Sequence, residues 1–109
     1  MANTFKLKTK ANVGISTQNV YVVPSATTTV VIGITLANTS GSGVNVGVGI
    51  TRAGTTEDVK LLKNAPIPQG SSLEFMGGNK VVLETTDTVT VDSDTNNSVD
   101  ATLTIMEIT

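Results

Sequence analysis

Residues 28–37 read TTVVIGITLA, and this stretch decides the fold class because its large apolar residues recur with a period of two. The opposite face carries only small or mildly apolar residues. We therefore expect a long β-strand with one face in the core, and we expect Ile32→Asp to prevent folding by burying an unpaired charge. The face expected in the core holds Val30, Ile32, Ile34 and Leu36.

The next stretch predicts a partner for this strand. Residues 38–43 read NTSGSG, a composition that favours turns. Residues 44–51 read VNVGVGIT, in which Val and Ile again recur with a period of two. We predict a long hairpin between the two strands. The small face at Gly47 and Gly49 would let another backbone or subunit approach closely.

The same period continues through the rest of the chain. Residues 64–70 read NAPIPQG and cannot form a central strand, because their prolines lack N–H donors; we expect a crossing between sheets. About eight strands and no helix predict an all-β fold, an antiparallel β-sandwich or jelly roll, in one domain over residues 1–109. The other predicted strands lie near residues 5–8, 20–23, 59–62, 73–75, 81–83, 89–91 and 99–105.

The composition excludes most catalytic chemistry. The chain has no histidine, cysteine or tryptophan, so it offers no imidazole base, no thiolate nucleophile and no soft metal ligand. We expect a protein that is not an enzyme and has no cofactor or metal. Charged residues make up 15% of the chain, against about 25% in an average protein. A surface with so few charges is typical of a subunit in a large assembly, and the aromatic-poor core would gain stability from neighbouring copies.

Charge and hydropathy also exclude two kinds of partner. The cationic cluster Lys6, Lys8 and Lys10 lies in a chain of net charge −2, so we expect no nucleic-acid binding. No apolar stretch approaches the roughly 20 residues of a membrane span, and the N-terminus has no signal-peptide core, so we expect no membrane partner. The absence of cysteine fits synthesis in a reducing cytoplasm.

One loop has the spacing of a calcium site. Residues 92–96 read DSDTN, but the sixth position is Asn97 where such loops need glycine, and the twelfth is Leu103 where they need glutamate. A hairpin loop rich in turn-forming residues explains the pattern without an ion.

Two groups of carboxylates are candidates for acid–base chemistry. They are Glu57 with Asp58, and Glu84 with Asp87. A glycosidase would need a cleft and a raised pKa at one carboxyl group, which the sequence does not indicate, so we expect neither group to be catalytic.

The two ends of the chain are the predicted assembly contacts. Residues 1–11 alternate apolar and cationic side chains, which predicts a half-buried strand with a lysine-bearing outer face. This arm either closes its own sheet or joins a neighbour by strand addition. At the other end the alternation of apolar residues shifts by one position after Ile105, so that Met106 and Ile108 are apolar. This shift predicts a bulge or a tail that meets another surface. The predicted contacts are Phe5, Lys6, Leu7, Lys8, Lys10, Met106 and Ile108.

Several stretches over nearly the whole chain resemble a known class of protein. They are VYVVPS at 20–25, ITLANTSG at 34–41, KNAPIPQGSS at 63–72, KVVLE at 80–84, and SVDA at 98–101 leading to EIT at 107–109. They resemble the small virion structural proteins of marine tailed phages, including cyanophages. The resemblance implies an accessory virion protein, made in the host cytoplasm, that contacts its own copies and other virion proteins in the tail, neck or head decoration.

The alternative is a carbohydrate- or receptor-binding module of a tail fibre. Sugar sites usually present exposed aromatic rings beside polar groups. The aromatic residues here are Phe5, Tyr21 and Phe75, and alternation places the two phenylalanines inward.

Overall fold

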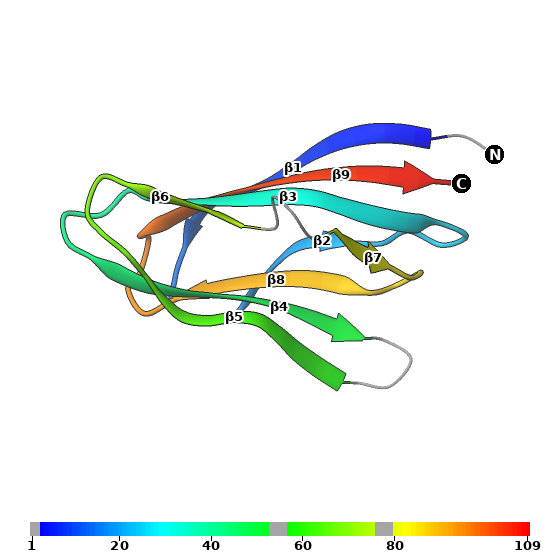
Figure 1. Cartoon of the computed structure of the whole chain (residues 1–109). Coiled ribbons are helices and arrows are strands. Elements are labelled where there is room, and N and C mark those ends of the chain that lie inside the picture. The colour runs from blue at the N-terminus through cyan, green and yellow to red at the C-terminus, as the bar shows by residue number, and fades with distance from the viewer. Residues whose placement is uncertain (1–2, 53–56, 76–79) are drawn as a thin grey trace.

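Two antiparallel β-sheets face each other across a core of branched aliphatic side chains (Figure 1). The structure is a computed structural model that describes residues 3–52, 57–75 and 80–109. The all-β sandwich predicted from the sequence is confirmed. The strands are β1 (Asn3–Val13), β2 (Gln18–Val22), β3 (Thr28–Asn38), β4 (Val44–Arg52), β5 (Glu57–Ile67), β6 (Ser72–Phe75), β7 (Val81–Leu83), β8 (Thr88–Ser93) and β9 (Val99–Ile108).

The strand order is that of a jelly roll. Sheet A has the order β1-β9-β3-β6, and β7 also pairs with β3; sheet B has the order β2-β8-β4-β5. The strands β6 and β7 pair with different parts of β3, at Ile34–Ala37 and Thr29–Val31, so together they occupy one edge position. The chain crosses between the sheets several times, as it does in a double Greek key.

The core contains the small branched residues that the composition predicts. Its largest fully buried side chains include Leu36, Ile67, Leu83, Leu103 and Ile105. On β9 the buried residues follow a strict period of two, which confirms the predicted inner face from Val99 to Ile105. The predicted shift in alternation after Ile105 is wrong, because Glu107 continues the buried series.

A β-bulge corrects the predicted face of β3. Its pairing with β9 shifts register between Val31 and Gly33. Val31, Ile34 and Leu36 are buried, whereas Val30 and Ile32 are only half-buried. The extra residue reverses the parity, so the predicted inner face is right from Ile34 onward and wrong before it. The expectation that Ile32→Asp prevents folding therefore loses its basis.

The predicted hairpin between residues 28–37 and 44–51 is wrong. Strand β3 lies in sheet A and β4 in sheet B, where β4 pairs with β5 and β8. The polar turn between them crosses from one sheet to the other. It is held by buried Asn38, whose Nδ2 donates to the carbonyls of Ser42 (2.8 Å) and Ile67 (3.0 Å). Polar turn residues serve a hairpin and a crossing equally well, so composition does not separate the two.

The crossing predicted over residues 64–70 is confirmed in part, because residues 64–67 still belong to a strand and the chain crosses only after Ile67. Pro66 lies on β5, an edge strand of sheet B, and after Ile67 the chain passes to β6 in sheet A. The small face of β4 has a local explanation. A Cβ atom at Gly47 would lie 2.5 Å from Asp92 Oδ1, and one at Gly49 would lie 3.0 Å from the Val59 carbonyl. The expected close approach of another backbone is therefore confirmed at Gly49, and that backbone belongs to β5 of the same chain.

Candidate functional site

The edge strand β1 is turned the opposite way from the prediction. In antiparallel pairs, directly opposed residues share a face. Lys6 is opposite Ile105 and Lys8 is opposite Leu103, so the lysines lie on the inner face of sheet A. Phe5 lies on the outer face and is 71% exposed. The predicted lysine-bearing outer face is therefore wrong.

Four apolar side chains form a row across the outer face of sheet A. Phe5 on β1 is opposite Met106 on β9. Met106 is opposite Val30 on β3, and Val30 is opposite Val82 on β7. Val82 is 62% exposed, and Met106 and Val30 are half-buried. We call Phe5, Met106, Val30 and Val82 the apolar row.

Apolar residues adjoin the apolar row on both sides at its β1 and β9 end, whereas the exposed Lys80 and Glu84 lie two positions either side of Val82. Leu7, opposite Thr104, adjoins it on one side and is 62% exposed. Ile108, opposite both Asn3 and Thr28, adjoins it on the other. An exposed apolar patch of this kind is typical of a protein–protein contact.

The structure divides the seven predicted assembly contacts between two faces. The four apolar residues gather on the outer face of sheet A, whereas the three lysines belong to its inner face. Sequence reasoning missed Val30 and Val82, which complete the row. Only the register of β3 with β9 and β7 reveals them, because the bulge moves Val30 out of the core. The predicted contacts on the outer face are Phe5, Leu7, Met106 and Ile108, and those on the inner face are Lys6, Lys8 and Lys10.

A polar cluster explains why the lysines face inward. Glu107 is buried, and its Oε1 atom lies 2.9 Å from Lys6 Nζ. Its Oε2 atom accepts a hydrogen bond of 2.5 Å from the Tyr21 hydroxyl. The Tyr21 oxygen also lies 2.8 Å from Thr29 Oγ1, and Lys8 Nζ lies 5.8 Å from the Tyr21 ring centre. We call Glu107, Tyr21, Thr29 and Lys6 the Glu107 cluster. It ties β1, β3 and β9 of sheet A to β2 of sheet B.

The two acidic groups in this cluster have pKa values displaced in opposite directions. Hydrogen bonds from Tyr21 and Lys6 hold the pKa of Glu107 below its ordinary value. Burial, and then the hydrogen bond to Glu107, raise the pKa of Tyr21 to about 12. At neutral pH the cluster therefore contains a carboxylate, a neutral phenol that donates to it and an ammonium group.

Of the two groups of candidate carboxylates, Glu84 with Asp87 occupies a structural position. Arg52 Nε donates to Asp87 Oδ1 at 3.0 Å, and Arg52 Nη2 contacts Glu84. The Asp87 carboxylate also accepts the Glu84 N–H at 2.9 Å, so the group fixes the turn between β7 and β8 against β4. Glu57 and Asp58 are exposed at the start of β5.

The loop with calcium-like spacing forms hydrogen bonds of its own. Asp94 Oδ1 accepts the Asn45 N–H at 3.1 Å, and the hydroxyls of Ser93 and Ser98 lie 2.6 Å apart. In the described ranges, no three His, Cys, Asp or Glu side chains gather as they would around a metal ion.

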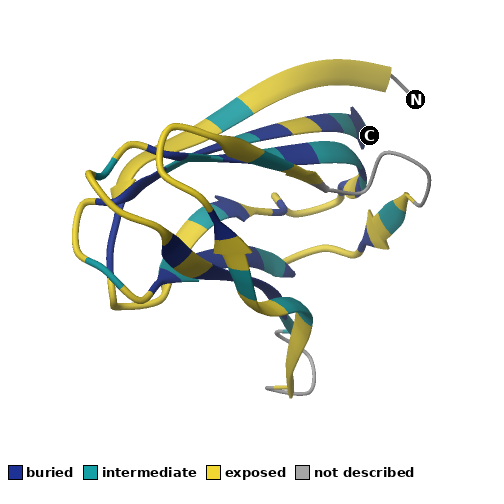
Figure 2. Ribbon diagram, turned by 60° about the vertical axis from the view of Figure 1, so that its left-hand side comes forward, coloured by how far each residue is buried: buried dark blue, intermediate teal, exposed yellow. Residues whose placement is uncertain are grey.

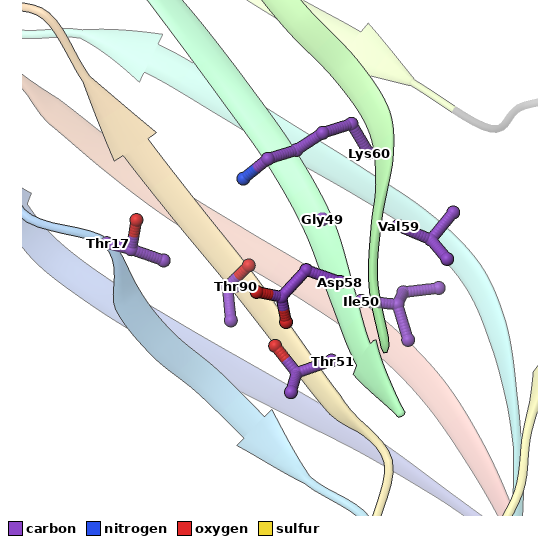
Figure 3. A pocket seen from close by; sticks show the side chains of 8 residues that line it. All are labelled: Thr17, Gly49, Ile50, Thr51, Asp58, Val59, Lys60 and Thr90. Carbon is purple, nitrogen blue, oxygen red and sulfur yellow. The ribbon is translucent and has the colours of Figure 1, made fainter. Parts of the chain in front are cut away.

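A shallow hollow of about 150 Å³ lies on the outer face of sheet B (Figure 3). Asp58 and Lys60 reach from β5 across Gly49 toward Thr90 on β8. This volume is below the roughly 300 Å³ at which small-molecule sites begin. The hollow follows from the missing side chain at Gly49, and its residues do not form a recognisable catalytic set.

Comparison with known proteins supports the fold. No family model and no curated protein matches the sequence. One solved structure is similar to this chain, and it is described as "Bacillus endospore appendages form a novel family of disulfide-linked pili". The match covers 99% of this chain and 87% of the other chain, with a TM-score of 0.57 and 15% sequence identity. At that identity the likeness shows a shared β-sandwich fold and does not show a virion protein. The part of the chain that the structure describes contains no membrane-spanning helix.

Proposed function

We propose that this chain is a non-enzymatic structural subunit that assembles in many copies through the outer face of sheet A. The observation that carries this proposal is the apolar row. Phe5 and Val82 lie at its two ends and are 71% and 62% exposed, so contact with another surface would remove both from water. At the Phe5 end the adjoining residues Leu7 and Ile108 are apolar, so contact there would not require the desolvation of an ion.

The partner that best fits this face is a second copy of the chain. The four residues of the apolar row carry no charge that would repel the same row of another copy, and a net charge of −2 leaves little long-range repulsion between copies. The fold likeness to an appendage described as a pilus supports polymerisation. These 109 residues contain no cysteine, so their copies would associate without disulfide bonds.

The particle that we propose is the virion of a tailed bacteriophage, with the subunit in the tail, neck or head decoration. The sequence resemblance to small virion proteins supports this assignment. A second candidate is a cell-surface appendage, which the fold likeness favours. Mass spectrometry of purified virions and of purified appendages from the same culture separates the two. Abundance in infected cells with absence from virions would remove the virion assignment.

The receptor-binding alternative loses one of its aromatic residues. Tyr21 is only 5% exposed, and its hydroxyl is bonded inside the Glu107 cluster, so it cannot present a ring to a sugar. Phe5 is exposed, but its direct neighbours on the outer face are the apolar Met106 opposite it and Leu7 beside it on β1. The side chain of Phe75 lies outside the described residues.

Sedimentation velocity of single variants tests the assembly. We expect the parent protein to sediment as a multi-copy species and Phe5→Ser and Val82→Ser to shift it toward the monomer. Val22→Ser is the matched control, because Val22 is 50% exposed on β2 in the other sheet. Circular dichroism confirms that each variant is folded. A monomeric parent, or row variants that sediment as the parent does, would contradict the proposal.

A further inference from the structure

The strand β1 buries almost none of its side chains. Every residue from Asn3 to Asn12 is exposed except Lys8, which is half-buried (Figure 2). Its pairing with β9 runs from Asn3 opposite Ile108 to Lys10 opposite Ala101. The strand is therefore held by its backbone ladder, by the cationic contacts of Lys6 and Lys8, and by very little hydrophobic burial.

The boundary between this strand and the rest of the fold is sharp. Val13 is fully buried, and its carbonyl accepts the Ser98 N–H at 3.1 Å. The carbonyl of Gly14 accepts the Ser93 N–H at 2.9 Å. Just before this anchor, Asn12 has a φ of 58°, and the register with β9 shifts between Lys10 and Val13. A bulge beside a buried residue can act as a hinge, because a change in a few backbone angles there would redirect the strand that precedes it.

The position that β1 occupies has specific chemical requirements. Without β1, the edge of β9 from Ala101 to Ile108 would lose its hydrogen-bonded neighbour. Glu107 would keep its hydrogen bond from Tyr21 but would lose the cation of Lys6, and removing one partner of a buried ion pair is costly. The site therefore selects a strand with lysines at alternate positions. In this chain the KLKTK stretch at residues 6–10 has that pattern.

We propose that β1 is an exchangeable arm, and that in the assembly residues 3–12 of one copy pair with β9 of a second copy. The inference rests on the proposed multi-copy function and adds a second mode of contact to it. Exchange keeps every contact of the Glu107 cluster, because the arm of a neighbour supplies the same lysines. It also places Phe5 of one copy in the apolar row of the next, with Leu7 beside it, so strand exchange and the apolar face would reinforce each other.

Engineered thiols with one shared acceptor position test the exchange. Thr102 on β9 is opposite Thr9 on β1 and also opposite Thr35 on β3. Directly opposed residues have Cα atoms about 4.5–5.5 Å apart, which suits a disulfide or a short thiol-bridging reagent. The chain has no cysteine, so the new thiols are the only ones present.

The experiment refolds pairs of single variants together and compares their cross-links. We expect a mixture of Thr9→Cys and Thr102→Cys to yield covalent dimers of the two variants after assembly. A mixture of Thr35→Cys and Thr102→Cys should yield few, because β3 is central in its own sheet. The corresponding double variants serve as controls that each pair can be bridged. The T9C/T102C variant should form covalent multimers, and T35C/T102C should bridge only within its chain.

The outcomes separate this inference from the proposed function. If the protein sediments as an assembly but T9C/T102C bridges only within single chains, strand exchange is wrong and the assembly proposal stands. If the two mixtures cross-link equally, the links report contact between faces, and exchange is again wrong. A protein that is monomeric by sedimentation would overturn both.

Discussion

Glu107 determines the orientation of β1, because its two carboxylate oxygens bond to different strands on the inner side of sheet A. Oε1 meets Lys6 on β1, and Oε2 accepts from Tyr21 on β2. An inward lysine on an edge strand discourages indiscriminate pairing with other sheets. Lys6 also has a specific partner in Glu107, so the same charge that discourages pairing with other sheets stabilises the pairing of β1 with β9.

We expect Glu107→Gln to destabilise the protein by about 1–2 kcal/mol, because it removes the ionised acceptor that Tyr21 and Lys6 share. Urea denaturation measures the change. Glu84→Gln is the control, because the Glu84 carboxylate is exposed and its partner Arg52 keeps Asp87. Equal losses in the two variants would show that the Glu107 cluster has no special role in stability.

The cluster predicts two pH windows of lost stability. Glu107 has a lowered pKa in the fold, so its stabilisation is complete above the ordinary value of 4.5 and is lost as the pH falls through the folded value. Tyr21 has a pKa raised from 10.0 to about 12, so its stabilisation is complete below 10.0 and is lost as the pH rises toward 12. Denaturant titrations across both ranges should show a weaker acid dependence in Glu107→Gln and a weaker alkaline dependence in Tyr21→Phe. Unchanged pH profiles would show that the cluster does not couple to folding.

At the scale of the element, alternation predicts strands well and their faces less well. The strand positions and the crossing at the prolines follow from local residue chemistry, so the sequence was sufficient for them. The bulge at Val31–Gly33 is marked in the sequence only by Gly33, which does not by itself give the shift in register, and the bulge determines which valine joins the apolar row. The orientation of β1 depends on Glu107, about one hundred residues away along the chain, and a period of two cannot report such a contact.

The bulge predicts different outcomes for two similar substitutions on β3. Leu36→Asp should prevent folding, because Leu36 is fully buried and the new charge would have no partner. Ile32→Asp should leave a folded protein, because Ile32 is half-buried beside the register shift. Circular dichroism and urea denaturation distinguish the outcomes, and loss of folding in both variants would contradict the position of the bulge.

Deletion of residues 1–11 should leave a folded sandwich with a lower oligomeric state. The deleted residues bury little, and the anchor at Val13 remains. Some stability should be lost, because Glu107 loses the contact with Lys6. Circular dichroism with sedimentation velocity measures both effects. If the deletion unfolds the protein and the parent has no oligomer to lose, the arm belongs to its own core.

At the scale of the whole molecule, the distribution of apolar residues favours association. The core consists mainly of valine, isoleucine and leucine, and it is supplemented by one buried tyrosine among the described residues. Meanwhile Phe5, Leu7 and Val82 remain exposed on one face of sheet A. A neighbour that covers this face would add burial that the single chain lacks.

This distribution predicts that thermal stability depends on protein concentration. Association of folded copies stabilises them by mass action, so each tenfold rise in concentration should raise the unfolding midpoint by roughly 2–5 °C for a domain of this size. Differential scanning calorimetry over a hundredfold concentration range measures the shift. Val82→Ser should flatten the dependence because it interrupts the apolar row, whereas Val22→Ser should leave it as in the parent because Val22 lies on sheet B. A midpoint in the parent that does not change with concentration would mean that the folded chain gains no stability from its neighbours.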